Sequence, residues 1–182
     1  DMPATPSNAP PKPPALLMLH PTLDLPPPPE PCFGQYPRGF IAAVLAELRC
    51  ARDEVLHVCS GALTEGWRVD LRQAARPTLR ADCRALPLRG GSIPAVLIDP
   101  PYTPEYADRL YGTDYPTPAS LLREAARVVR PSGRIGFVHF IVPNPPPRSR
   151  LVQVIALAVG CGYALRAVTI FEREQDALPG IT

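Results

Sequence analysis

Asp99-Pro100-Pro101-Tyr102 is the segment of this chain best equipped for chemistry, because it puts an acid, a rigid backbone carbonyl and an aromatic ring within four residues. It directly follows the apolar run 93–98, which predicts a buried strand. Each proline fixes φ and removes a backbone donor, and the residue before each proline is held in extended geometry. The Asp99 carboxylate and the Pro100 carbonyl are therefore fixed acceptors beside the Tyr102 ring. Such a set can hold a flat group that carries an NH₂.

Two further acids follow predicted strands upstream of this segment. Asp70 lies near the end of the predicted strand 67–71, and Asp82 follows the predicted strand 79–81. Ligands in open α/β sheets bind at the carboxyl ends of the strands, and a carboxylate can accept two hydrogen bonds from neighbouring hydroxyl groups. Three acids at successive strand ends, Asp99 included, therefore predict a shared binding edge.

The segments around these acids alternate between strand and helix patterns. Strands are predicted at 54–59, 67–71, 79–81, 95–98, 135–142 and 163–172, and helices at 38–53, 118–129 and 151–159. Residues 102–115 are predicted to form a long loop or a broken helix. This alternation predicts an α/β, Rossmann-like, mostly parallel sheet. Only 61–66 and 72–78 separate the early strands, so the crossovers there must be shortened, because a parallel crossover normally needs about a dozen residues.

The ends of the chain differ in composition from its middle. The first 31 residues hold 12 prolines, including the run 26–29, which predicts an extended or disordered segment at 1–31. The globular domain is expected to span 32–174, with a short tail at 175–182. The apolar run 16–19 is too short for a membrane span or a signal core, so no membrane partner is expected.

Charge and cysteine content restrict the function classes. The formal net charge is only +2, from 19 basic and 17 acidic residues, so charge alone does not indicate a nucleic-acid-binding protein. The odd, scattered set of cysteines is typical of a reduced, cytoplasmic protein, and no metal site is expected because their spacing fits none. The five cysteines are at positions 32, 50, 59, 83 and 161.

On these motifs, residues 36–172 resemble class I S-adenosylmethionine-dependent methyltransferases of the amino-methyltransferase type. Asp99-Pro100-Pro101-Tyr102 matches the catalytic motif of the adenine-N6 enzymes. Cys59-Ser60-Gly61 occupies the place of the glycine-rich cofactor loop, although Gly61 is its one glycine. Asp70 matches the acid that binds the ribose hydroxyls, and Asp82 matches the acid that reads the cofactor adenine. The resemblance therefore implies S-adenosylmethionine as the cofactor.

The activity that this resemblance implies is methyl transfer to an exocyclic amino group of a nucleobase, with adenine N6 in DNA favoured. We expect the Asp99 carboxylate and the Pro100 carbonyl to accept the two N–H bonds of that amino group, which frees its lone pair. The Tyr102 ring is expected to stack on the base. In duplex DNA the base must first be flipped out of the stack.

Two alternatives remain open at this stage. Small methyltransferases that act on adenine N6 or guanine N2 of RNA carry similar motifs. A non-catalytic binding subunit of the same fold is the other alternative, and the glycine-poor cofactor loop supports it. No target-recognition domain is evident, so substrate selection is assigned to the loop 103–117, to a homodimer or to a separate specificity subunit.

Aromatic and histidine side chains near the motif have weaker assignments. Tyr106, Tyr111 and Tyr115, with Arg109, either form an aromatic and basic wall beside the target base or pack their rings onto the domain. The two histidines in predicted strands, His57 and His139, are expected to be packed core residues and not catalysts.

Overall fold

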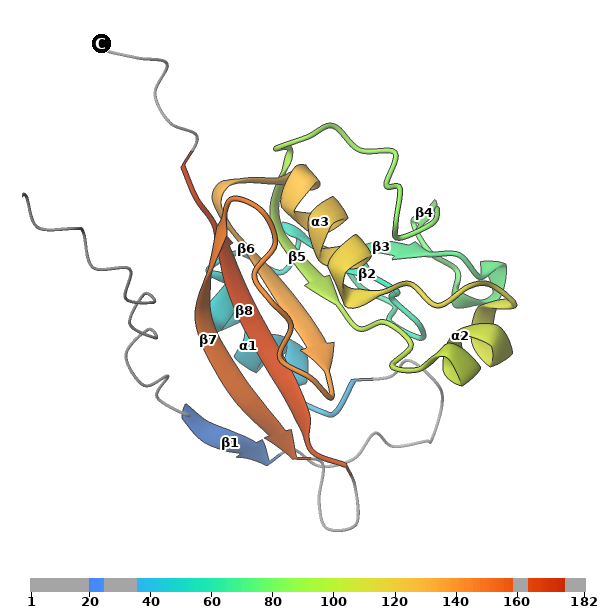
Figure 1. The fold of residues 1–182 in the computed structure, drawn as a ribbon, viewed down its shortest axis with the longest axis horizontal. Helices are drawn as coiled ribbons and strands as arrows, with labels where there is room; N and C mark the ends of the chain where they lie inside the picture. The colour runs from blue at the N-terminus through green and yellow to red at the C-terminus, as the bar shows by residue number, and fades with distance from the viewer. Residues whose placement is uncertain (1–19, 25–35, 159–163, 176–182) are drawn as a thin grey trace, which may run out of the picture.

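The fold is built around one eight-stranded sheet, seen in a computed structural model that describes residues 20–24, 36–158 and 164–175 (Figure 1). The strand order across the sheet is β1-β7-β8-β6-β5-β2-β3-β4. The strands are β1 (His20–Asp24), β2 (Val55–Val58), β3 (Trp67–Asp70), β4 (Leu79–Arg80), β5 (Ile93–Ile98), β6 (Val129–His139), β7 (Ser149–Ala158) and β8 (Arg166–Arg173).

Most neighbouring strands are parallel, which confirms the predicted sheet. The pairs β4·β3, β3·β2, β2·β5 and β5·β6 are parallel, whereas β8 runs antiparallel to both β6 and β7. The carboxyl ends of β2 to β6 therefore meet at one edge of the sheet. Because β8 is reversed, its first residue, Arg166, lies at that same edge.

Two helices cover opposite faces of the central strands (Figure 1). On one face, α1 (Phe40–Leu48) buries Phe40, Val44 and Leu48 in a core cluster with residues of β5, β6 and β8. On the other face, α3 (Pro118–Val128) buries its apolar residues in a second cluster. A Cβ at Gly136 of β6 would stand 2.9 Å from Leu97 Cδ1, so glycine is what permits the close packing beside α1.

The early crossovers are short, as expected. A loop at 59–66 without a helix joins β2 to β3, and only the 3₁₀ turn Gln73–Ala75 lies between β3 and β4. Arg68 of β3 braces both connections, since its guanidinium donates to the carbonyl oxygens of Leu63 at 3.1 Å and Arg76 at 3.0 Å. The donors of one side chain thus hold loops that crossover helices would otherwise fix.

The predicted helix at 151–159 is wrong. Residues 149–158 form strand β7, and residue 159 lies outside the described part of the chain. The run is apolar almost throughout, and such a run does not distinguish a buried helix from a buried strand. Pairing with β8 on one side and β1 on the other decides the outcome, so tertiary context overrides the helix propensity of its leucines and alanines.

Other boundaries differ by a few residues. Helix α1 is shorter than the predicted 38–53, because Gly39 (φ 80°) and Arg49 (φ 51°) adopt left-handed conformations at its two ends. Strand β6 begins at Val129, before the predicted residue 135. Within 102–115, the helix α2 (Pro104–Tyr111) starts at the Thr103 cap, so the predicted broken helix is present.

The proline-rich N-terminal segment contributes one strand. Residues 20–24 form β1, which pairs in parallel with β7 at the edge of the sheet, where a proline such as Pro21 is tolerated. These five residues are extended. The rest of 1–31, residues 32–35 and the tail from 176 onward lie outside the described residues.

Candidate functional site

The acid of the tetrapeptide stands where β5 ends. The Asp99 N–H donates to the Val58 carbonyl of β2 at 3.3 Å, so the residue is still held against the sheet. The Tyr102 hydroxyl donates to Asp99 Oδ1 at 2.5 Å. Arg166 Nη1, from the first residue of β8, donates to the same hydroxyl oxygen at 3.3 Å. The result is a short chain of hydrogen bonds that runs from Arg166 through Tyr102 to the carboxylate.

Burial changes the acidity of both members of this pair. Burial raises the pKa of Asp99 to about 6, although the Tyr102 hydrogen bond and the Arg166 charge oppose the rise. Burial and the nearby Asp99 charge raise the pKa of Tyr102 well above its usual value. Tyr102 is therefore a protonated donor, and Asp99 is an ionised acceptor at neutral pH that titrates close to it.

Aromatic rings surround Tyr102. Its ring meets those of His139 and Phe140 edge to face, with centroids 5.2 and 4.6 Å away. Tyr115 Oη lies 3.4 Å from the Tyr102 carbonyl oxygen and 3.2 Å from His139 Nε2. The Ile141 N–H donates to His139 Nδ1, so we assign the proton to Nε2, which donates to Tyr115. His139 is thus a buried histidine with both nitrogens engaged, as expected.

An apolar rim lies beside this aromatic group. Phe140, Ile141 and Val142 follow β6, and Leu165 precedes β8; all four are about half exposed or more. The surface next to Asp99 is therefore largely apolar and aromatic, with Arg166 as its charged neighbour, and the apolar part suits a flat ring.

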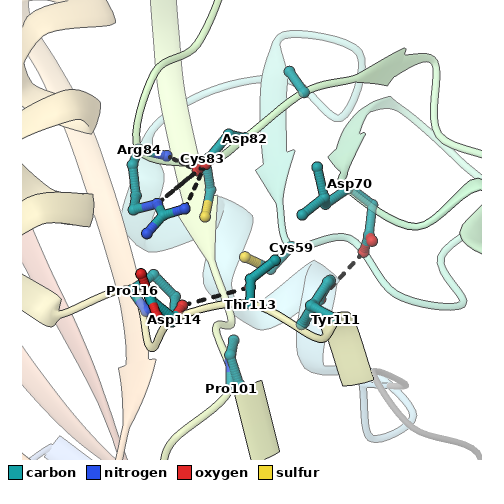
Figure 2. A pocket seen from close by; sticks show the side chains of 12 residues that line it. Cys59, Asp70, Asp82, Cys83, Arg84, Pro101, Tyr111, Thr113, Asp114 and Pro116 are labelled. Carbon is teal, nitrogen blue, oxygen red and sulfur yellow. Dashed lines mark hydrogen bonds and ion pairs between the residues drawn. The ribbon is translucent and has the colours of Figure 1, made fainter. Parts of the chain in front are cut away.

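A cleft adjoins the tetrapeptide on its other side (Figure 2). It is narrow, with a cavity volume of about 20 Å³, little more than one water needs. Figure 2 shows side chains from the ends of β2 and β3, from 81–84 and from 111–116 around it. Pro101 lines it as well, so the tetrapeptide forms part of its wall.

Asp70 is fully buried at the cleft, and protein donors surround its carboxylate. The Gly61 N–H donates to Oδ2 at 3.0 Å, and the Arg72 N–H donates to Oδ1 at 2.8 Å. The Tyr111 hydroxyl also reaches Oδ2, at 3.5 Å, which is the longest of the contacts (Figure 2). Asp70 therefore fixes the loop after β2, and the Tyr111 contact is the one that a ligand would most easily replace.

Asp82 is held mainly by Arg84, with a further hydrogen bond from Cys83. Arg84 donates to both carboxylate oxygens through Nε and Nη2, at 2.7 to 3.1 Å, and its backbone N–H donates to Oδ1 at 2.8 Å. The hydrogen bond from Arg84 lowers the pKa of Asp82. About a third of each side chain is exposed, so this pair can open at small energetic cost.

The loop after β2 makes a left-handed turn at two residues. Cys59 has φ 57° and Gly61 has φ 54°, and the Ser60 N–H donates to the Val69 carbonyl. The Ser60 hydroxyl is buried and has no hydrogen-bond partner within 36–158 and 164–175. A hydrogen bond with Cys83, together with burial, raises the pKa of the Cys59 thiol.

Not every residue predicted for this region lies together. The cleft is lined by Cys59, Asp70, Asp82 and Pro101. Asp99 is not among its lining residues and is hydrogen-bonded to Tyr102. The three tyrosines do not form one wall: Tyr111 reaches Asp70 and Tyr115 reaches His139, while Tyr106 is exposed with Arg109 over its ring.

Sequence reasoning missed two residues from distant segments. Arg166 donates a hydrogen bond to Tyr102, and Tyr36 carries a buried hydroxyl without a partner among the described residues. Arg166 reaches Tyr102 only because β8 is antiparallel, which no local pattern reveals. Tyr36 stacks on Phe40 just before α1, and an aromatic residue that precedes a helix is too common to signal a site.

Searches of protein-family models and of curated proteins find no match. Solved structures do match. TrmN from Thermus thermophilus has a TM-score of 0.51 and 19% identity over 72% of this chain. A chain from the complex of the Haloferax volcanii Trm112 methyltransferase activator with a methyltransferase has a TM-score of 0.53 and 11% identity, over 74% of this chain and 89% of its own length.

A third match is the Burkholderia thailandensis 1,6-didemethyltoxoflavin-N1-methyltransferase with bound S-adenosylhomocysteine. Its TM-score is 0.50, with 13% identity over 76% of this chain and 78% of its own length. The present chain spans about half the length of TrmN, 47%. These likenesses confirm the expected class I methyltransferase fold.

Among residues 20–24, 36–158 and 164–175, no helix is long and apolar enough to cross a membrane. No group of three or more His, Cys, Asp or Glu side chains in those residues could hold a metal ion.

Proposed function

We propose that this chain is an S-adenosylmethionine-dependent methyltransferase that acts on an exocyclic amino group of a nucleobase, with adenine N6 in DNA as the favoured acceptor. One observation carries the proposal. The buried Asp99 carboxylate stands at the carboxyl end of β5 with an aromatic ring beside it, and the same tetrapeptide walls the cleft on the cofactor side. Acceptor and methyl donor would therefore meet at these four residues.

The residues around the cleft fit the cofactor in part. The left-handed turn at Cys59-Ser60-Gly61 and the unpartnered Ser60 hydroxyl suit a loop that wraps a ligand. Asp70 would take the ribose hydroxyls once Tyr111 releases it, and Asp82 would take the adenine amino group once Arg84 releases it. When bound, S-adenosylmethionine supplies a methyl group on a positively charged sulfur. The S-adenosylhomocysteine in the Burkholderia neighbour supports this choice.

Orientation would do most of the catalytic work. The acceptor N–H replaces the Tyr102 hydroxyl on Asp99 Oδ1, and the second N–H bonds to the Pro100 carbonyl. Tyr102, freed from the carboxylate, stacks on the ring. Transfer would break the bond between the methyl group and sulfur, with S-adenosylhomocysteine as the leaving group. The proton that the methylated nitrogen then loses would pass to Asp99, whose pKa of about 6 suits brief protonation.

A non-catalytic binding subunit is the second candidate. Its specific support is that both cofactor acids are engaged by the protein's own donors. In that role the fold would serve a partner protein. The complex that contains the Trm112 activator supports only the possibility of a protein partner. Substrate selection by a homodimer or by a separate specificity subunit belongs to the same group of proposals.

The test offers labelled S-adenosylmethionine with DNA and RNA in separate reactions, followed by digestion and identification of the labelled base. We expect N6-methyladenine in the DNA reaction. Label in RNA alone would replace the acceptor with an RNA base. Label in neither pool, from protein that binds the cofactor, would contradict the nucleobase proposal.

A further inference from the structure

The side chain of Tyr36 ends in a buried hydroxyl. Its ring stacks on Phe40, with centroids 4.8 Å apart and planes at 17°. The hydroxyl oxygen has no hydrogen-bond partner among residues 36–158 and 164–175. Buried polar groups are nearly always hydrogen-bonded, so an exception of this kind needs an explanation.

Tyr36 lies beside the loop after β2. It lines a cavity together with Ala62 and Leu63 of that loop. Its ring, like that of Tyr102, packs against the core cluster that α1 forms with the sheet, and the Asp99 charge helps to raise its pKa. The Tyr36 side chain therefore lies at the junction between the loop after β2 and the tetrapeptide.

The electrostatics of this junction indicate what the hydroxyl can bind. Burial first, and then the Asp99 charge, raise the pKa of Tyr36 well above its usual value. The hydroxyl therefore stays protonated, and its oxygen keeps two acceptor lone pairs. A negative carboxylate nearby favours a ligand that brings N–H groups or positive charge.

We propose that Tyr36 is a further binding residue of this site, whose hydroxyl oxygen accepts a hydrogen bond from an N–H group of a bound ligand. The proposal rests on the proposed methyltransferase function. Two ligand groups have this chemistry: the amino group held by Asp99, and the α-amino group of S-adenosylmethionine. Both would bind near the unpartnered hydroxyl oxygen of Tyr36.

A second unpartnered hydroxyl provides a matched control. Thr169 is fully buried in the middle of β8, and its Oγ1 also lacks a partner among the described residues. It pairs with Phe137 and Val154 inside the sheet. Thr169→Val removes a buried hydroxyl at nearly constant shape, as Tyr36→Phe does, but away from the ligand junction.

The experiment compares wild type, Tyr36→Phe and Thr169→Val by thermal unfolding without ligand, by calorimetric titration with S-adenosylmethionine and by methyl-transfer kinetics with varied acceptor. Both variants should melt at or above the wild-type temperature, because each loses an unsatisfied buried group. We expect Tyr36→Phe alone to weaken ligand binding, by about tenfold. A weaker cofactor Kd assigns the contact to the α-amino group, whereas a raised acceptor KM with unchanged Kd assigns it to the acceptor.

Two results would overturn the inference. Tyr36→Phe could bind cofactor and acceptor as wild type does, which would leave the hydroxyl without a ligand. Alternatively, the variant could melt below Thr169→Val and wild type, which would make the hydroxyl structural. A wild-type protein that binds no S-adenosylmethionine would instead contradict the proposed function, so the two failures are distinguishable.

Discussion

The two halves of the sheet position their acids in different ways. In the half formed by β5, β6 and β8, strands of six to eleven residues pack between α1 and α3. In the half formed by β2, β3 and β4, strands of two to four residues are joined by loops. In the first half, the Asp99 carboxylate accepts one side-chain hydrogen bond, from the Tyr102 hydroxyl, and its pKa is raised. In the second half, Asp70 and Asp82 each accept several hydrogen bonds.

This difference shows what each framework can support. A strand fixed by two helices can hold a buried carboxylate with few partners, because packing keeps the acid in place. Short loops have no such packing and depend on side-chain bonds such as those of Arg68 and Asp70. The acids of the loop-rich half are therefore structural as well as candidate ligand groups.

The largest expected effect is on catalysis in the helix-covered half. Asp99→Asn should lower the methyl-transfer rate by about a thousandfold or more, since the acceptor loses its charged hydrogen-bond partner. Cofactor affinity should stay within a few fold of wild type. Radiolabel transfer and calorimetry measure the two quantities on the same preparations.

Asp53→Asn is the matched control, because Asp53 is an exposed residue between α1 and β2, away from the tetrapeptide. It should keep wild-type transfer. Near-normal turnover by Asp99→Asn would contradict the assignment of Asp99.

Much of this comparison was predictable from sequence, because acids after apolar runs mark strand ends whatever the tertiary fold. The sheet class, the short crossovers and the order of Asp70, Asp82 and Asp99 follow from that pattern. Strand β7 was not predictable, since its apolar run fits a helix equally well until β8 and β1 pair with it. Arg166 and Tyr36 depend on chain direction and on burial, which local spacing does not encode.

The second prediction concerns stability in the loop-rich half. Asp70→Asn should lower the free energy of unfolding by about 2–3 kcal/mol, because its amide would oppose the Gly61 or Arg72 N–H donors. Denaturant unfolding without ligand measures this loss. Asp82→Asn is the control, and it should change stability by less than about 1 kcal/mol because its ion pair is partly exposed.

If Asp70→Asn and Asp82→Asn lowered the free energy of unfolding equally, the assignment of Asp70 as a structural acid and Asp82 as a surface acid would be contradicted. A fully stable Asp70→Asn protein with weakened cofactor binding would assign Asp70 to the ligand alone.

The smallest expected effect is a pH dependence that belongs to the helix-covered half. The raised pKa of Asp99, about 6, means that the acid loses its charge as the pH falls through that value. Transfer should therefore decline about tenfold per pH unit below 6. For the same reason, the stability that protonated Asp99 contributes is present at low pH and is lost as pH rises through about 6.

Rates and melting temperatures between pH 5 and pH 8 test both statements. Asp99→Asn should lose the pH dependence of melting in this range and melt above wild type at pH 7.5. An acid limb of the rate that lies near pH 4 would show that Asp99 titrates as an ordinary exposed carboxylate.

The loop-rich half is proposed to bind S-adenosylmethionine although its two acids, Asp70 and Asp82, already accept hydrogen bonds from the protein. Calorimetric titration of the wild-type protein with S-adenosylmethionine tests this most directly. We expect saturable binding of one cofactor per chain with a micromolar Kd, which corresponds to a binding free energy of about −8 kcal/mol. The absence of saturable binding at millimolar cofactor would contradict it and favour the non-catalytic binding subunit.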